Sequence, residues 1–354
     1  MSRILLIMLI AAPAAVIARL AGADPVLVFI LSAAGLIPLA DMIGEATEEL
    51  AAYTGPRLGG LLNATLGNAA ELIITVFAIR EGLLDLVKAS ITGSIVGNLL
   101  LVLGLSLLAG GLRNGLQFFD RRQAGLNATL LILAVVALAI PSLFDVAVAE
   151  VPSSELLFSE GVAIVLIILY GLTLLYGFTA HTPDHAVTRE AAPEHEARWS
   201  LRFSIIVLVI ATVGTAIVSE TLVGAVEPVT QALGLTEFFL GIIVIPLIGN
   251  VAEHLAAVTV AVKNKMELSL SIALGSSLQI ALFVAPLLVF ISLLFGKRLL
   301  LVFNEFELIA LIGASVIAAF ISQDGESNWL EGAMLLAVYL IIGLAFFFLP
   351  PHFA

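Results

Sequence analysis

Two glutamates, Glu71 and Glu253, fall in the middle of apolar segments of this 354-residue sequence. An ionised carboxylate inside a bilayer is costly unless it is paired, hydrated or bound to a cation. Acidic residues are therefore rare in membrane segments, and those that occur mark ion or proton sites by default. The two positions predict a cation or proton site inside a membrane protein.

Each glutamate closes a copy of the same short motif, G-N-x-A-E. The copies are Gly67-Asn68-Ala69-Ala70-Glu71 and Gly249-Asn250-Val251-Ala252-Glu253. In both copies the asparagine lies three residues before the glutamate, so the two side chains share one helical face. The glycine before them favours a bent or broken helix, whose freed carbonyls can line a site.

Both motifs are followed at the same distance by a Gly-Ser pair. These pairs open the segments Gly93-Ser94-Ile95-Val96-Gly97-Asn98 and Gly275-Ser276-Ser277-Leu278-Gln279. Their hydroxyl and amide groups offer further oxygen ligands from two more helices. The alternative role is helix packing, because Gly93 and Gly97 form a small-xxx-small pair.

A constant offset of 182 residues relates the two copies of the motif and the two Gly-Ser pairs. The same offset pairs Glu45 with Glu227, Thr54 with Thr236, and Gly59 with Gly241. We expect five helices in each copy, and an odd number makes the second copy cross the membrane in the opposite direction. Such inverted repeats place the substrate site near the middle of the membrane.

The predicted ligands are carboxylate, amide and carbonyl oxygens, a set that suits Ca²⁺ better than a soft transition metal. Two carboxylates neutralise one Ca²⁺ or two protons, so the cation and the protons compete for one site. His254, next to Glu253, is the only histidine of five inside a membrane segment. It is either a proton carrier or a packed core histidine.

The composition excludes the main soluble classes. Hydrophobic residues make up 61% and charged residues only 12%, whereas soluble domains are about 25% charged. Cysteine is absent, which excludes disulfides and thiolate metal sites, and we expect no resident cofactor. The net charge of −12 argues against a nucleic-acid partner. An all-α polytopic membrane protein remains.

Eleven stretches are long and apolar enough to predict transmembrane helices. They lie near 4–20, 25–50, 58–79, 86–109, 124–144, 158–178, 201–226, 236–262, 268–295, 305–322 and 329–349. The predicted units are an N-terminal helix (1–24, or alternatively a cleaved signal), two repeats (25–180 and 201–354), and an acidic, histidine-containing linker (181–200). The loops predicted between helices include Thr54-Gly55-Pro56-Arg57.

The basic residues predict the orientation, because Lys and Arg concentrate on the cytoplasmic side. Of the 15 basic residues, five fall on the side away from the N-terminus: Arg19, Arg80, Lys88, Lys297 and Arg298. The majority on the other side favours a cytoplasmic N-terminus and a cytoplasmic linker.

The motifs resemble those of the calcium/proton antiporters of the cation/calcium exchanger superfamily. The segment from Gly59 to Leu72 looks like that family's first repeat signature, and Gly249–His254 looks like its second. The resemblance spans nearly the whole chain. It implies export of Ca²⁺ against protons by alternating access, with Glu71 and Glu253 binding either ion by turns and helices 25–50 and 201–226 sliding as a gating pair.

The resemblance also implies that Asn68, Asn250, Ser277 and Gln279 contribute to or support the metal site, beside Glu71 and Glu253. His254 would share in proton coupling. The absence of a long N-terminal extension favours a microbial cell membrane over a vacuole, and family analogy favours a homo-oligomer.

Three alternatives are compatible with the sequence. Sodium/calcium exchangers are similar in architecture but typically carry a proline before the motif glutamate, where this chain has Ala70 and Ala252. A cation channel with an acidic filter fits inverted repeats less well than a carrier. An intramembrane metalloprotease lacks its H-E-x-x-H motif here, so we expect no enzyme.

Overall fold

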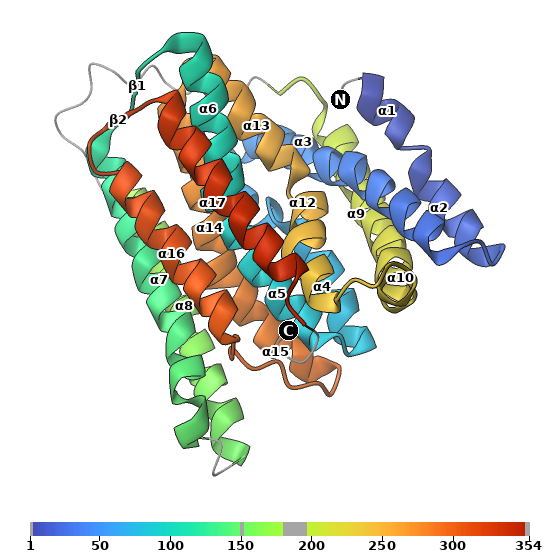
Figure 1. Ribbon diagram of the computed structural model, residues 1–354. Helices are drawn as coiled ribbons and strands as arrows, with labels where there is room; N and C mark the ends of the chain where they lie inside the picture. The colour runs from blue at the N-terminus through green and yellow to red at the C-terminus, as the bar shows by residue number, and fades with distance from the viewer. Residues whose placement is uncertain (1–2, 149–151, 180–196, 351–354) are drawn as a thin grey trace.

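The computed structural model describes residues 3–148, 152–179 and 197–350, which are almost entirely helical (Figure 1). The first part contains α1 (Arg3–Met8), α2 (Ala11–Leu20), α3 (Pro25–Leu66), α4 (Ala69–Glu81), α5 (Leu84–Val96), the π-helix η1 (Gly97–Val102), α6 (Leu103–Asn114), α7 (Arg121–Val148) and α8 (Pro152–Thr179). The second contains α9 (Leu201–Gly224), α10 (Val226–Leu233), α11 (Glu237–Phe239), η2 (Leu240–Val244), α12 (Ile245–Gly249), α13 (Val251–Val262), α14 (Met266–Gln279), η3 (Ile280–Val284), α15 (Ala285–Leu294), α16 (Glu305–Ile321) and α17 (Trp329–Phe347).

The predicted all-α fold is confirmed, with one small addition. Two short strands, β1 (Gln117–Phe118) and β2 (Glu326–Ser327), pair antiparallel and tie the loop after α6 to the loop before α17.

The chain is a multi-pass membrane protein. Among the described residues, seven helices are long and apolar enough to cross a bilayer, or eight if the bent pair Val226–Leu233 and Glu237–Gly249 forms one span. The predicted number of eleven therefore stays a prediction. The N-terminal stretch Ile4–Leu20 is among the shorter apolar helices, and it divides into α1 and α2.

The helix α3 contains the reversal that was predicted between its two apolar stretches. Residues eight apart in a straight helix are about 12 Å apart. A Cβ built on Gly59, however, would lie 2.9 Å from the Cβ and the carbonyl oxygen of Ala51. The chain therefore folds back on itself between Ala51 and Gly59, and the candidate span ends at Thr54, although helical backbone continues through residues 54–57.

Most of the predicted linker lies outside the described residues, which resume at Ala197. Its end is fixed to α3. The carboxylate of Glu49 accepts hydrogen bonds from the backbone N–H groups of Arg198 (2.7 Å) and Trp199 (3.0 Å), and Ser200 caps α9. These contacts join the starting end of α9 to the far end of the first span.

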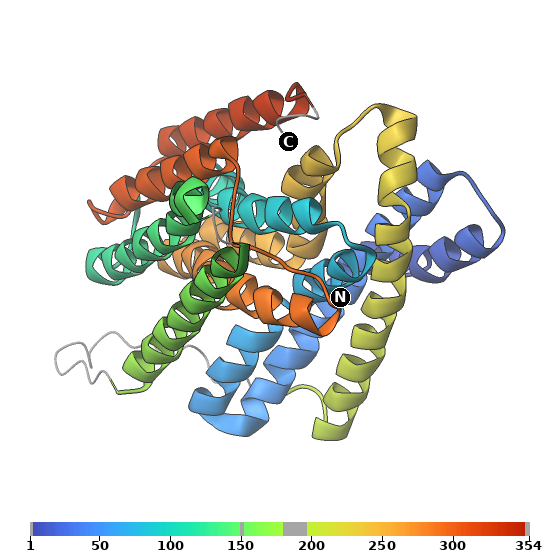
Figure 2. The same cartoon turned by 90° about the horizontal axis from the view of Figure 1, so that it is seen from below.

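The helices form three groups when the molecule is seen from below (Figure 2). The helices α7, α8, α16 and α17 lie on one side, and α1, α2 and α9 lie on the other. The cyan α4 and α5 and the orange α14 and α15 lie between these groups. The first motif ends in α4, and the two Gly-Ser pairs lie in α5 and α14.

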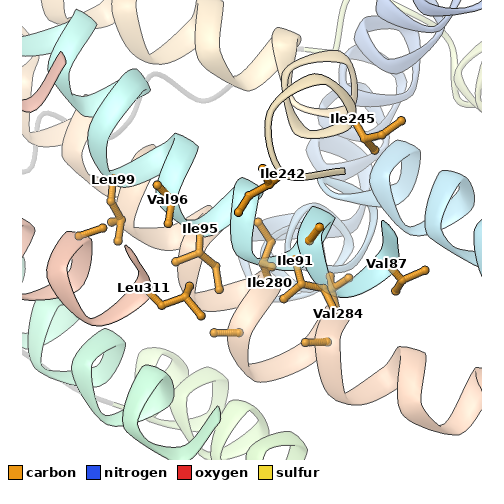
Figure 3. Packing of buried hydrophobic residues seen from close by; sticks show 14 of the residues in the cluster. Val87, Ile91, Ile95, Val96, Leu99, Ile242, Ile245, Ile280, Val284 and Leu311 are labelled. Atoms are coloured by element: carbon orange, nitrogen blue, oxygen red, sulfur yellow. The ribbon is translucent and has the colours of Figure 1, made fainter. Parts of the chain in front are cut away.

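The helix α5 is the centre of the core (Figure 3). Every residue from Ala89 to Leu100 is buried, so this segment is enclosed on all faces, including the polar side chains of Ser90, Thr92, Ser94 and Asn98. The side chains of Val87, Ile91 and Ile95, four residues apart, pack with Ile280 and Val284 of η3 in one continuous cluster. The two halves of the sequence thus share one core.

Several elements repeat at the sequence offset of 182 residues. The helix α4 (Ala69–Glu81) corresponds to α13 (Val251–Val262), and α5 (Leu84–Val96) corresponds to α14 (Met266–Gln279). Even the π-helical turns η1 and η3 follow at equivalent places.

Candidate functional site

Both motifs lie at a helix interruption, where an asparagine takes the non-helical backbone. Asn68 (φ −94°, ψ 20°) precedes α4, and Asn250 (φ −111°, ψ 10°) precedes α13. Glu71 and Glu253 therefore occupy the first turns of these helices. Backbone N–H groups at a helix start lack helical partners and carry partial positive charge, which stabilises a nearby carboxylate.

The motif glycines provide room for the glutamate of the other repeat. Gly67 keeps helical angles (φ −55°, ψ −44°), so the interruption itself falls on Asn68. A Cβ built on Gly67 would lie 3.4 Å from Oε1 of Glu253, and one built on Gly249 would lie 3.5 Å from Cβ of Glu71. The two motifs cross at the same point, each glycine beside the opposite glutamate.

The Glu71 side of the crossing is buried and joined to α5. Glu71, Asn250 and Ser94 are each at most 2% exposed. The Ser94 hydroxyl donates a hydrogen bond to Oε1 of Glu71, and Nδ2 of Asn250 donates one to the Ser94 oxygen at 3.2 Å. One carboxylate, one hydroxyl and one amide thus come from α4, α5 and the start of α13.

The Glu253 side repeats this arrangement with residues of α14. The Ser276 hydroxyl is a hydrogen-bonding neighbour of the Glu253 carboxylate, and it also donates to Oδ1 of Asn68 at 3.3 Å. Nδ2 of Asn68 donates to Oε1 of Gln279 at 2.7 Å, and Nδ2 of Asn98 donates to the Ser276 oxygen at 3.0 Å. The network links the two halves of the chain.

The structure therefore brings together five of the residues singled out in the sequence: Glu71, Glu253, Asn68, Asn250 and Gln279. Ser277 lies apart, because its hydroxyl donates to the Ala273 carbonyl of its own helix at 2.9 Å. His254 is 9% exposed, and among the described residues no hydrogen bond joins its ring to either glutamate.

Three further members of this network, Ser94, Ser276 and Asn98, lie in the two Gly-Ser segments that were expected to offer oxygen ligands, but they were not assigned to the metal site. The repeat offset contained the signal for the two serines, because they occupy equivalent positions. Ser277 has no such counterpart, since the equivalent residue is Ile95. Asn98 has no equivalent asparagine, since the offset pairs it with Ile280.

Each glutamate keeps one carboxylate oxygen without a hydrogen-bond partner. These atoms, Oε2 of Glu71 and Oε2 of Glu253, are buried and have no donor within the described part of the chain. A buried acceptor without a donor is unfavourable, and a proton or a cation removes that penalty. The geometry is therefore suited to a positively charged ligand.

A cavity of about 580 Å³ leads to one of the two glutamates. Its lining includes Gly67, Gly249, Glu253, Gly275, Ser276 and Gln279. Asp41, Glu45 and Glu48, spaced four and three residues apart on one face of α3, also line it. Glu71 is not among the lining residues, so the cavity reaches the Glu253 side alone.

The oxygen atoms around the crossing are carboxylate, amide and hydroxyl oxygens, which are ligands for hard cations such as Ca²⁺. Within residues 3–148, 152–179 and 197–350, no group of three or more His, Asp or Glu side chains is placed to hold a metal ion. The two carboxylates at the crossing come from different helices and carry the only acidic groups of the hydrogen-bond network described above.

Comparison with protein families supports the relationship that these motifs suggest. The model of the sodium/calcium exchanger protein family matches residues 25–179 and 203–348. The chain belongs to this family.

Named members of the family are similar in sequence to this chain over almost its full length. The Ca(2+)/H(+) antiporter of Aphanothece halophytica is 48% identical over 344 residues, covering 92% of this chain and 91% of the relative. The Ca(2+)/H(+) antiporter ChaA of Bacillus subtilis is 44% identical, covering 99% and 100%.

Solved structures share the fold. The structure of native YfkE is similar with a TM-score of 0.85 at 42% identity, covering 98% of this chain and all of that one. The H+/Ca2+ exchanger CAX matches with a TM-score of 0.75 at 16% identity, covering 97% and 91%, which shows a common fold.

Proposed function

We propose that this family member is a secondary active transporter that exchanges Ca²⁺ for protons. The observation that carries the proposal is the crossing of two equivalent motifs, which sets Glu71 and Glu253 beside one another's glycines, each with an unpartnered buried oxygen. Relatives at 44–48% identity named Ca(2+)/H(+) antiporters support the same pair of ions.

The exchange follows from charge balance at the crossing. Two carboxylates form a neutral complex with one Ca²⁺ or with two protons, and both loaded forms avoid a bare charge inside the membrane. The empty site carries two negative charges, so it is the form least able to reorient. Ca²⁺ and protons therefore bind by turns, with at least two protons per Ca²⁺.

Each named side chain has a role in this scheme. Glu71 and Glu253 bind the cation or the protons, while Asn68, Asn250 and Gln279 contribute or support oxygen ligands. Ser277, whose hydroxyl bonds to the Ala273 carbonyl of its own helix, supports the site through α14. His254 takes part in proton coupling, because it adjoins Glu253. Gly67 and Gly249 leave the space in which the two motifs meet.

The cavity supports an alternating-access cycle with the site open to one side. It extends from Glu253 along α13 past Ala256, in the direction of Lys263 and Lys265. With the N-terminus in the cytoplasm, as the basic residues predict, that side is cytoplasmic and the conformation is inward-facing. Ca²⁺ enters from the cytosol and leaves on the other side of a microbial cell membrane.

This cycle uses the two repeats as inverted partners. The crossing lies between residues 25–180 and 201–354, and each unit supplies one motif and one Gly-Ser helix. Assembly into a homo-oligomer and a separate role for the 181–200 linker stay predictions.

The experiment that tests the proposal is Ca²⁺ uptake by inverted membrane vesicles containing the full chain. We expect ⁴⁵Ca²⁺ uptake driven by an imposed proton gradient, saturable with Ca²⁺ and abolished by a protonophore. Uptake driven equally well by a sodium gradient would show sodium coupling instead. Non-saturable flux independent of any counter-ion would indicate a channel. Either result overturns the proposal.

A further inference from the structure

The helix α5 touches η2 so closely that only glycine fits at the contact. A Cβ built on Gly93 would overlap the carbonyl group of Ile242. A Cβ built on Gly241 would lie 2.8 Å from Cβ of Ala89 and 2.9 Å from the carbonyl oxygen of Leu86. The contact is buried, since Leu86 and Ala89 are at most 1% exposed, and none of these residues lines the cavity.

The equivalent contact in the other half of the molecule is open. The offset of 182 residues relates Leu86 to Leu268, Ala89 to Ser271, Gly93 to Gly275, and Gly241-Ile242 to Gly59-Gly60. A Cβ built on Gly275 would meet nothing within 4 Å, and Gly275 and Ser271 line the cavity. Leu268 is 48% exposed, whereas its counterpart Leu86 is 1% exposed.

We propose that α14 closes onto Gly59-Gly60 in the opposite conformation, with Gly275 against Gly60 as Gly93 now lies against Ile242. The inference rests on the alternating access proposed above. Each half of the molecule then has one gate with a glycine at its contact. The gate at Gly93 is closed in this conformation, and the gate at Gly275 is open. Gly275 is thus a positioning residue, which leaves the ion untouched and allows two backbones to meet.

The physical basis is the missing side chain. Backbones of packed helices approach closely only where glycine or another small residue lies at the contact. A methyl group at position 275 has free space in the described conformation. In the proposed closed contact it would overlap the facing backbone, as a methyl group at position 93 would overlap Ile242 here. The substitution should therefore leave the described conformation intact and oppose the other.

The first test compares Gly275→Ala with a control at Gly44, which lines the same cavity and whose Cβ would also meet nothing within 4 Å. The counterpart of Gly44 is Val226, which is 0% exposed in the closed half, so a side chain is tolerated there. We expect Gly275→Ala to lower proton-driven ⁴⁵Ca²⁺ uptake at least about tenfold. Ca²⁺ binding to the purified protein and the uptake rate of Gly44→Ala should stay within about twofold of wild type.

The second test measures whether the gate at Gly275 is open, and it does not depend on which ion is exchanged for Ca²⁺. The chain has no cysteine, so Ser271→Cys introduces a single thiol. In detergent, a water-soluble maleimide should label this thiol rapidly in the otherwise unchanged protein. The labelling rate should be the same when Gly275→Ala is added. Gly93→Ala obstructs the other contact and favours the opposite conformation, so it should slow labelling of Ser271→Cys at least about tenfold.

The two proposals fail in different ways. A wild-type protein without proton-driven Ca²⁺ uptake contradicts the proposed function, while the labelling result still reports on the gate. Uptake by Gly275→Ala at the wild-type rate overturns the gate proposal. So does unchanged labelling of Ser271→Cys in a folded Gly93→Ala protein.

Discussion

The two sides of the motif crossing carry the same sequence pattern in different surroundings. Glu71 is 1% exposed and is enclosed by Ser94 and Asn250, whereas Glu253 lines a cavity of about 580 Å³. The helix α5 lies against η2, while its counterpart α14 faces open space. A repeat that is symmetric in sequence is thus asymmetric in packing, as expected of one state of a two-state carrier.

The largest effect should come from removing the charge on either side. Glu71→Gln and Glu253→Gln keep the shape of the side chain but bind neither a proton nor a cation by charge. We expect both to reduce proton-driven ⁴⁵Ca²⁺ uptake in inverted vesicles to background, because the cycle needs two carboxylates for one Ca²⁺.

Glu307 provides the control for this prediction. It is also buried, at 2% exposure, but it lies outside the hydrogen-bond network of the crossing and accepts hydrogen bonds from the Asn304 backbone and Thr92. Glu307→Gln should retain uptake. Full activity in both Glu71→Gln and Glu253→Gln would contradict the role of the crossing.

The next prediction concerns how fast a water-soluble reagent reaches the Glu253 side and the Glu71 side of the crossing. Ala252 and Ala70 precede the two motif glutamates, yet Ala252 lines the cavity and Ala70 is 4% exposed. In the cysteine-free chain, Ala252→Cys should react with a membrane-impermeant maleimide in inverted vesicles at least about tenfold faster than Ala70→Cys, because burial protects a thiol. Equal rates would remove the asymmetry on which the comparison depends.

A smaller effect, on the KM for Ca²⁺, should distinguish Ser94 and Ser276 of the network from the neighbouring Ser277. Ser94→Ala and Ser276→Ala each remove a hydroxyl beside a glutamate, and a hydrogen bond to a charged group contributes about 1.5–3 kcal/mol. We expect the KM for Ca²⁺ to rise by about tenfold or more in each variant. Ser277→Ala should change it less, since the Ser277 hydroxyl bonds to its own helix. A larger effect at Ser277 would indicate that this side chain turns towards the ion during transport.

The smallest effect is on the stability of the fold, and it comes from a hydrogen bond that only the first repeat makes. Thr92 of α5 donates a hydrogen bond to Oε1 of Glu307 at 3.1 Å, whereas its repeat counterpart is Leu274. Thr92→Val should lower the free energy of unfolding by about 1–3 kcal/mol, because it leaves a buried carboxylate oxygen without a donor. Denaturant unfolding of the purified protein measures the loss, with Thr129→Val, on the exposed part of α7, as the control.

Much of the fold could be predicted from the sequence, because the fold depends on local composition. Apolar stretches of membrane length predicted the helical membrane fold, and the reversal in α3 followed from the polar, proline-containing break at residues 54–57. The number of spans was harder to predict, since helices such as α4 and α13 are interrupted or short. Length and hydropathy alone do not decide whether such segments cross the bilayer.

The residues that come in pairs follow from the amino-acid sequence: the two glutamates, their asparagines, their glycines and the Gly-Ser helices are all related by one offset. Tertiary structure alone decided what these pairs do. It placed the helix interruption on Asn68 and Asn250, put Gly67 and Gly249 against the opposite glutamates, and turned Ser276 to the site and Ser277 away from it. The reason is that a repeat fixes equivalent positions, whereas burial, access and hydrogen bonding depend on how two distant segments pack in one conformation.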